Sequence, residues 1–232
     1  MNPARGALKR KLARRERVLG VGVDYPSPAL AERLAGAGFD LVFIDCEHGG
    51  PGIERVAEMA RAVRAGGGAS VLRPWSRDPG LIRRYLDCGV DGLIAPEIGD
   101  AAEARAVAAA IAAGDPPDAG NIVLIPLIET VAGLGALDAI LGVPGVDGVQ
   151  VGPGDLAVSM GLPRRGRHPA VMAASLDLFR RAAAAGRSCG GLVGRFGAAA
   201  LREAGANILM VSADELLAGG IAAFRAGLEA EA

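Results

Sequence analysis

Two kinds of segment alternate along the whole chain, and this alternation leaves few folds possible. Short runs rich in Val, Ile and Leu are followed by longer segments rich in Ala and charged residues. Each short run is continuously apolar, which is typical of a strand covered on both faces. Eight such runs are found, at residues 17–23, 39–45, 69–74, 91–96, 122–129, 147–152, 189–194 and 207–212.

The segments between these runs have the apolar spacing of helices. Residues 51–65 repeat apolar side chains at helical intervals, and Pro51 stands where helices often begin. Asp78 is a suitable N-cap for the helix that follows it. Eight strand-then-helix units in 232 residues predict a single (β/α)8 TIM barrel over residues 1–232. An open, doubly wound sheet is the alternative, but the sequence VGVDYPSP after the first run lacks the GxGxxG motif that would favour it.

Charge and composition argue against several kinds of partner. The formal net charge is −1, whereas a general nucleic-acid-binding protein would carry a basic surplus. Residues 9–17 (KRKLARRER) contain six Lys or Arg. We expect them in a solvated amphipathic helix within the N-terminal residues 1–17 rather than in a nucleic-acid site.

The sequence also bears on location. No apolar run reaches the roughly 18 residues that a membrane span needs, and no signal peptide is evident, so we expect no membrane partner. The three cysteines form no CxxC motif, which argues against a disulfide framework or a zinc site. A cytoplasmic protein is therefore expected.

Polar side chains gather where the predicted strands end, which is the end of a TIM barrel that carries the active site. They are Asp45, Glu47 and His48 at the end of the second run, Arg73 in the third, Glu97 after the fourth, Glu129 in the fifth, and Asp155 after the sixth, in a turn with Gly152, Pro153 and Gly154. Carboxylates grouped in this way are typical ligands of a hard divalent cation such as Mg²⁺ or Mn²⁺. The glycine-rich turn can present backbone N–H groups to a substrate anion. Weaker signals come from Asp24, Tyr25, Arg195, Ser212 and Asp214.

Each of these residues also has a purely structural interpretation. Glu129 is the least open to it, because a lone carboxylate in an apolar strand is costly unless it is paired or binds a metal. Asp155 could instead cap a helix, and Arg73 could be an ion-pair partner. His48 could simply hydrogen-bond the nearby backbone.

We interpret the second histidine and the cysteines as structural. His168 stands before a Pro that begins a helix, so we expect it to cap that helix. Cys46 shares its strand end with two acids, which disfavour the thiolate that a nucleophile needs. Cys88 and Cys189 are expected in the core.

Four stretches of this sequence resemble a known family. They are AGAGFDLVFIDCEHG, VLRPWSRDPGLIRRYLDCGVDGLIAPEI, LIPLIET and VPGVDGVQVGPGDLAVSMG. In this order they resemble the HpcH/HpaI aldolases, which are class II pyruvate aldolases with a TIM-barrel fold. The resemblance implies a divalent metal (Mg²⁺, Mn²⁺ or Co²⁺) and, as small-molecule partners, a 2-oxo acid and an aldehyde.

The resemblance also implies roles for individual residues. The metal ligands would be Glu129 and Asp155, the catalytic histidine His48, and the essential arginine Arg73. Asp87, at the end of a helix, would pair with the histidine of a neighbouring subunit. This agrees with a homo-oligomer, a hexamer being typical of the family. Asp45 and Glu47 match positions that shape the site, and Gly152, Pro153, Gly154 and Asp155 would bind the substrate with Arg73.

The sequence departs from the family pattern at four places. Cys46 stands where Gly is common, Leu127 where Gln is common, and Gly22 where some members have Trp. A long stretch that should follow Gly120 is missing. The missing stretch and Gly22 together predict a more open pocket.

Three functions are compatible with these residues. The first is a carbon–carbon lyase that cleaves or forms 4-hydroxy-2-oxo acids through a pyruvate enolate. The second is a biosynthetic condensing enzyme, similar to siderophore citrate synthases, that uses an enolate derived from oxaloacetate or pyruvate. The third is a non-catalytic barrel. A class I aldolase is disfavoured, because the only lysines are Lys9 and Lys11, in the predicted N-terminal helix.

Overall fold

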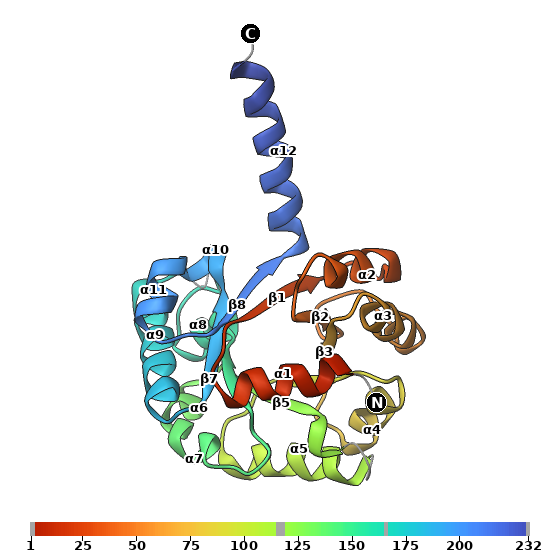
Figure 1. Ribbon diagram of the computed structural model, residues 1–232. Helices are drawn as coiled ribbons and strands as arrows, with labels where there is room; N and C mark the ends of the chain where they lie inside the picture. Colours follow the sequence, from red (N-terminus) through yellow and green to blue (C-terminus); the bar gives the residue numbers. More distant parts are fainter. Residues whose placement is uncertain (1–2, 115–118, 165–166, 231–232) are drawn as a thin grey trace.

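The computed structural model describes residues 3–114, 119–164 and 167–230, and its strands form a closed, wholly parallel barrel (Figure 1). The strands are β1 (Val18–Val23), β2 (Leu41–Asp45), β3 (Ala69–Arg73), β4 (Gly92–Ala95), β5 (Val123–Ile128), β6 (Gly148–Val151), β7 (Ser188–Leu192) and β8 (Ile208–Ser212). They follow chain order around the barrel, and β8 pairs with β1 to close it. The predicted TIM barrel is confirmed, and each strand lies within two residues of its predicted bounds.

Helices cover the outside of the barrel. They are α1 (Pro3–Ala13), α2 (Pro28–Gly36), α3 (Ile53–Ala65), α4 (Pro79–Asp87), α5 (Ala101–Gly114), α6 (Val131–Gly135), α7 (Leu137–Leu141), α8 (Pro153–Ser159), α9 (Pro169–Ala184), α10 (Val193–Phe196), α11 (Ala198–Glu203) and α12 (Ala213–Ala230), with the 3-10 turn η1 (Ala119–Asn121) before β5. Asp78 and His168 cap α4 and α9, as predicted. The predicted start at Pro51 is wrong, because the following Gly52 is the N-cap of α3.

Alternating residues of each strand face two separate cores. Outward-facing residues such as Val21 and Val42 pack under the helices, whereas Val18, Leu41 and Ile208 fill the inside of the barrel. Both faces are buried, which explains why the strands read as continuous apolar runs rather than alternating ones.

The N-terminal helix differs from the prediction of a solvated helix. α1 lies across the N-terminal end of the barrel (Figure 1), and its Leu8 and Leu12 are fully buried in the inner core. Three of its basic residues are held by the barrel, and Lys11 Nζ lies 2.6 Å from Asp40. Arg5 Nε lies 2.9 Å from the buried Asp91, and Lys9 Nζ lies 3.0 Å from Asp147.

These contacts explain the basic run at the N-terminus. The acids sit at the N-terminal ends of strands, where each also accepts a hydrogen bond from backbone: Asp91 from Ser70 N, and Asp147 from Leu124 N. Lys9 and Lys11 therefore hold α1 against the N-terminal end of the barrel. Neither lysine is placed to form a Schiff base at the opposite end.

The short connection before β5 bears on the prediction of a more open pocket. Residues 116–118 of the PPDAG stretch lie outside the described residues. The described part, η1, leads into β5 beside α1, where Lys9 Nζ donates to Ile122 O at 2.8 Å. This is the N-terminal end of the barrel. A stretch inserted here would begin at the end of the barrel opposite the chain's own pocket.

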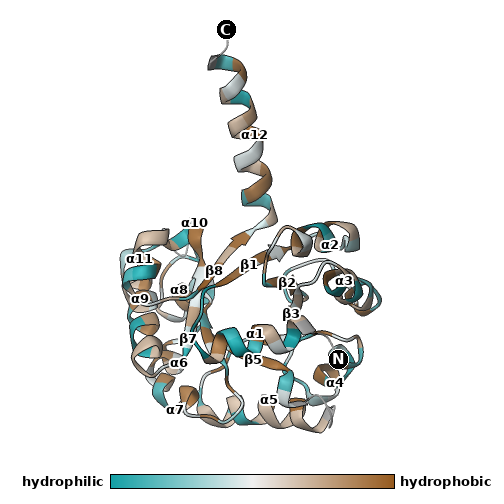
Figure 2. Cartoon of the chain, viewed as in Figure 1, coloured by the Kyte–Doolittle hydropathy of each residue, from teal (hydrophilic) through white to brown (hydrophobic). Residues whose placement is uncertain are grey.

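The C-terminal helix leaves the barrel (Figure 1). Every residue from Asp214 to Glu229 is exposed, including large apolar residues such as Phe224. Figure 2 shows hydrophobic residues along this helix. On the strands beside it, Leu19 is 37% exposed and Leu209 and Val211 are only partly buried. The eighth outer position of the barrel is thus uncovered. None of the helices within the described ranges is long and apolar enough to cross a membrane.

The packing of α1 predicts a stability effect. Leu12→Ala should lower the free energy of unfolding by about 2–5 kcal/mol, because it leaves a cavity in the inner core. Arg10→Ala, at an exposed position of the same helix, should change it by less than about 0.5 kcal/mol. Urea unfolding followed by circular dichroism measures both. Equal midpoints for the two variants would contradict a closing role for α1.

Candidate active site

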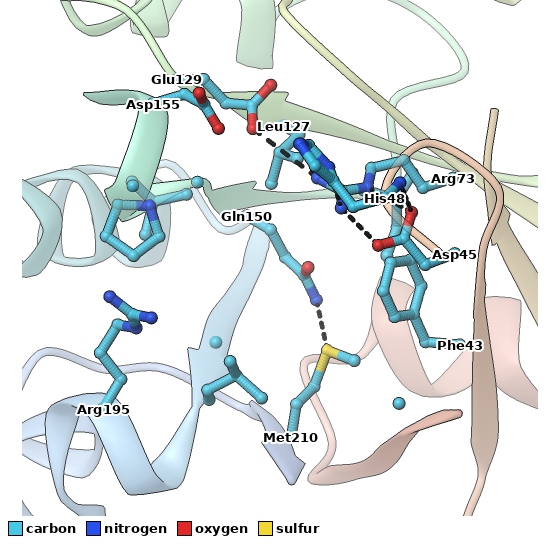
Figure 3. A pocket seen from close by; sticks show the side chains of 18 of the residues that line it. Phe43, Asp45, His48, Arg73, Leu127, Glu129, Gln150, Asp155, Arg195 and Met210 are labelled. Atoms are coloured by element: carbon cyan, nitrogen blue, oxygen red, sulfur yellow. Dashed lines mark hydrogen bonds and ion pairs between the residues drawn. The ribbon is translucent and has the colours of Figure 1, made fainter. Parts of the chain in front are cut away.

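A pocket of about 320 Å³ lies at the C-terminal ends of the strands (Figure 3). Its lining includes most of the polar residues predicted from the sequence: Asp45, His48, Arg73, Glu129, Gly152, Pro153, Gly154 and Asp155. The barrel brings together side chains that are more than 100 residues apart in the chain. This is where TIM-barrel enzymes carry their active sites.

Asp45 and Arg73 form a two-pronged ion pair between the ends of β2 and β3. Arg73 Nε and Nη2 lie 3.0 and 2.5 Å from the two Asp45 oxygens. Asp45 Oδ1 also accepts from the backbone N–H groups of Glu47 and His48, at 3.0 and 3.2 Å. Although burial opposes it, these bonds and the charge of Arg73 lower the pKa of Asp45. The acids after this strand therefore fix the turn that carries His48.

His48 is held between two guanidinium groups. Its Nδ1 lies 3.0 Å from Arg73 Nη2 and 3.3 Å from Glu47 Oε2, and its Nε2 lies 3.2 Å from Arg164 Nη2. The imidazole is half exposed at the pocket mouth. Within the described residues, the imidazole forms no hydrogen bond to the backbone, so the structural interpretation of His48 is not what its side chain does.

Glu129 is the most buried acid of the pocket, at 3% exposure. Its Oε2 accepts from Glu97 N at 2.9 Å, and Glu97 takes a left-handed conformation (φ 51°) as it donates. The Oε1 atom lies 4.0 Å from Arg73 Nη1. Burial raises the pKa of Glu129 to about 7, despite the hydrogen bond from Glu97. A nearby divalent cation would remove this cost of ionisation.

The GPGD turn makes room for that carboxylate. A Cβ on Gly152 would lie 2.2 Å from Glu129 Oε1, so no side chain fits there. Asp155 stands in the first turn of α8, where its oxygens lie 2.9 and 3.0 Å from Arg164 Nη2. It is therefore an ion-pair partner and not the helix cap that the sequence left open, because the N-cap residue is Gly152.

Two sets of groups could hold a metal. Asp45, Glu47 and His48 each place a ligand atom within 4.8 Å of the others. Asp45 and Glu47, however, are already bound by Arg73, and Glu47 lies 2.8 Å from its Nη1. Burial, and to a smaller extent the negative charges of Glu47 and Asp155, raise the pKa of Glu129, and its Oε1 has no hydrogen bond among the described residues. The Glu129–Asp155 pair is the better fit for a cation that prefers oxygen ligands.

Two residues considered in the sequence do not line the pocket, and three residues that do line it were missed or given little weight. Asp87 ends α4, is exposed, and does not line this chain's pocket. Burial raises the pKa of Cys46 to about 11, which agrees with its expected inertness. Sequence reasoning missed Arg164, whose segment has no periodic signal. It also missed Gln150, a lone polar residue in an apolar strand, and gave Arg195 too little weight; both line the pocket.

Comparison with known proteins agrees with this geometry. A model of the HpcH/HpaI aldolase/citrate lyase family matches residues 21–217. The chain belongs to this family. The pyruvate aldolase of Rhizobium etli is 37% identical over 204 residues, which cover 78% of this chain and 80% of that protein. The predicted resemblance is confirmed, and with it the assignment to the aldolases, which are lyases.

Solved structures lead to the same family. An HpcH/HpaI aldolase/citrate lyase family protein from Burkholderia cenocepacia has a TM-score of 0.84 and 30% identity, and the match covers 97% of this chain and 98% of that chain. The citrate synthase SbnG has a TM-score of 0.80 and 26% identity, with 97% and 98% covered. The similarity to a condensing enzyme is thus weaker than the similarity to the aldolases.

The close approach at Gly152 predicts how the two glycines of the turn differ. Gly152→Ala should displace the Glu129 carboxylate and weaken Mn²⁺ binding at least tenfold without unfolding the barrel. Gly154→Ala is the matched control, because its Cβ would meet nothing closer than Arg164 Cγ at 3.7 Å. Titration calorimetry with Mn²⁺ measures both. Equal affinities for the two variants would argue against Glu129 as a metal ligand.

Proposed function

We propose that this aldolase acts on 2-oxo acids with a divalent metal, and joins or separates pyruvate and an aldehyde as a 4-hydroxy-2-oxo acid. The observation that supports this most directly is the pair of neighbouring carboxylates, Glu129 and Asp155, beside an arginine and a histidine in one pocket. The pyruvate aldolase activity named for the Rhizobium etli relative agrees with it.

Glu129 and Asp155 would hold the cation, Mg²⁺, Mn²⁺ or Co²⁺. A divalent cation bound there supplies Lewis acidity that polarises the carbonyl of a 2-oxo acid. To bind the cation, Asp155 must release its ion pair with Arg164. The first backbone N–H groups of α8, beside Gly154, have no partner within the helix and can donate hydrogen bonds to the substrate carboxylate.

Arg73 would stabilise the negative charge that develops on the enolate oxygen. Asp45 holds two of its donor atoms at 3.0 and 2.5 Å, so the guanidinium is fixed before substrate binds. Its Nη1 borders the carboxylate pair, 4.0 Å from Glu129. A preorganised donor of this kind costs no rearrangement during the reaction. The ion pair with Asp45 is therefore compatible with a catalytic role.

His48 would move the proton of the C4 hydroxyl. A neutral imidazole keeps a lone pair on one ring nitrogen, and that nitrogen would act as the base. In cleavage it takes the hydroxyl proton and the C3–C4 bond breaks to release the aldehyde. The bonding electrons pass into the enolate, which becomes pyruvate when C3 is protonated.

Proton exchange at C3 of pyruvate tests this function without any aldehyde. Asp155→Asn should lower metal-dependent exchange more than a hundredfold, because the cation loses one of two carboxylate ligands. Asp138→Asn, an exposed acid of α7, should leave exchange unchanged. NMR of deuterated pyruvate with and without Mg²⁺, Mn²⁺ and Co²⁺ measures the rate.

Undiminished exchange in excess EDTA would refute the class II assignment. Repeating the assay with oxaloacetate and aldehydes separates cleavage from a biosynthetic condensation. A protein that binds Mn²⁺ yet exchanges no proton with either acid would be a non-catalytic barrel.

We also propose that the protein is a homo-oligomer in which α12 packs on a second copy. Leu217, Ile221, Phe224 and Leu228 follow one another at helical spacing and form a single exposed apolar stripe. The uncovered outer face of β1 and β8, with Leu19, is an apolar surface of the kind that stripe would cover. Exchange of α12 between copies would bury both surfaces.

An oligomer also gives Asp87 a role. This acid is at the opposite end of α4 from its own pocket, so it can reach only another chain's His48. The hexamer and the shared active site are supported by this position together with the family resemblance.

Charge placed on the apolar stripe should therefore separate the subunits. Phe224→Glu should lower the sedimentation coefficient, whereas Ala226→Glu on the opposite face of α12 should not.

Refolding Asp87→Asn together with His48→Ala should recover part of the activity that each variant lacks. A fully active wild-type monomer, or no recovery despite proven mixing, would contradict shared sites.

A further inference from the structure

The pocket contains an arginine that the proposed chemistry leaves without a task. Arg195 belongs to α10, the short helix that follows β7. Its side chain is partly buried and points into the pocket, facing the side that carries Glu129 and Asp155 (Figure 3).

Arg195 differs from the other arginines of the pocket in its partners. Arg73 is bound by Asp45 and Glu47, and Arg164 is bound by Asp155. In the described ranges, no carboxylate lies within ion-pair distance of Arg195, and no hydrogen bond to its guanidinium is formed. Its positive charge is therefore available to a molecule bound in the pocket.

The backbone beneath Arg195 is held in place. Phe196 is buried and packs edge-on against Phe179, with ring centroids 5.4 Å apart. Gly194 O accepts from Arg167 Nη2 at 3.0 Å, and Gly194 lies so close to Glu215 that a Cβ would be 2.0 Å from its Oε1. The position from which the guanidinium extends is thus fixed by contacts outside the pocket.

Small residues leave space around this arginine. Gly22, Gly191 and Ser212, from β1, β7 and β8, also line the pocket. A Cβ at Gly22 would meet nothing closer than Phe43 at 3.6 Å, so that side is not filled. Asp24 is the acid on this side, and it forms no ion pair with Arg195.

We infer that Arg195 binds a terminal anionic group, a carboxylate or a phosphate, on the aldehyde partner of the reaction. The inference rests on the proposed function, which puts the 2-oxo acid at Glu129 and Asp155 and the aldehyde in the remaining space. In the cleavage direction, the substrates are 4-hydroxy-2-oxo acids that carry a second anionic group at the far end.

Guanidinium chemistry fits this role. The planar fork of arginine donates two parallel hydrogen bonds to a carboxylate or phosphate, and such charge-assisted bonds are stronger than neutral ones. An aldehyde held at both ends would be oriented for attack by C3 of the enolate. A neutral aldehyde of the same length would lack this second contact.

Paired aldehydes test the inference. Succinic semialdehyde and butanal form the carboxylate pair, and glycolaldehyde phosphate and glycolaldehyde form the phosphate pair. Wild-type protein should use at least one anionic member with a kcat/KM at least tenfold above its neutral partner. Arg195→Gln should lower that kcat/KM by about 10–100-fold and leave the neutral aldehyde and pyruvate C3 exchange unchanged.

Two further variants separate charge from structure. Arg195→Lys should keep much of the preference for the anionic aldehyde, and Arg202→Gln, an exposed arginine of α11, should keep all of it. A preference that survives Arg195→Gln, or a wild-type preference for neutral aldehydes, would overturn the inference while C3 exchange still supports the proposed function. Loss of C3 exchange in the wild type would overturn both.

Discussion

The organisation of the site depends on a buried carboxylate that cannot easily be ionised. Glu129 is 3% exposed, and burial raises its pKa to about 7. The hydrogen bond from Glu97 and the charge of Arg73, 4.0 Å away, offset only part of this rise. Gly152 leaves space for the carboxylate. Glu97 has a left-handed backbone conformation, and its N–H donates a hydrogen bond to the carboxylate. Gly152 and Glu97 look unrelated in the sequence, yet the backbone of each accommodates the side chain of Glu129.

The charged groups of the pocket form two arrangements with different freedom. Asp45 and Arg73 are locked together at the ends of neighbouring strands and also fix the turn before His48. Arg164 and Asp155 are more exposed, at 57% and 37%, so their pair can be broken at little cost. A rigid pair beside an exchangeable one suits a site that must keep its geometry while it admits a cation and a substrate.

Charged residues at the two ends of the barrel have different roles: those at the N-terminal end stabilise the fold, and those at the C-terminal end surround the pocket. At the N-terminal end, α1 pairs Arg5 and Lys9 with Asp91 and Asp147 and closes the inner core with Leu12. A buried ion pair such as Arg5–Asp91 is costly to break from one side, which fixes the register of the helix against the barrel. At the other end the pairs surround an open pocket.

The sequence by itself indicated the fold, because eight continuous apolar runs alternate with helical segments and no GxGxxG motif follows the first run, which favours a closed barrel over an open doubly wound sheet. It also identified Glu129, since an acid in an apolar strand stands out. Tertiary structure decided what depends on distances between strands. Only the closed barrel shows that Leu8 and Leu12 of α1 are buried, that the connection before β5 lies at the end of the barrel away from the pocket, and that Arg164 and Arg195 line the pocket. These positions carry no local pattern, because side chains from different strands meet only once the barrel closes.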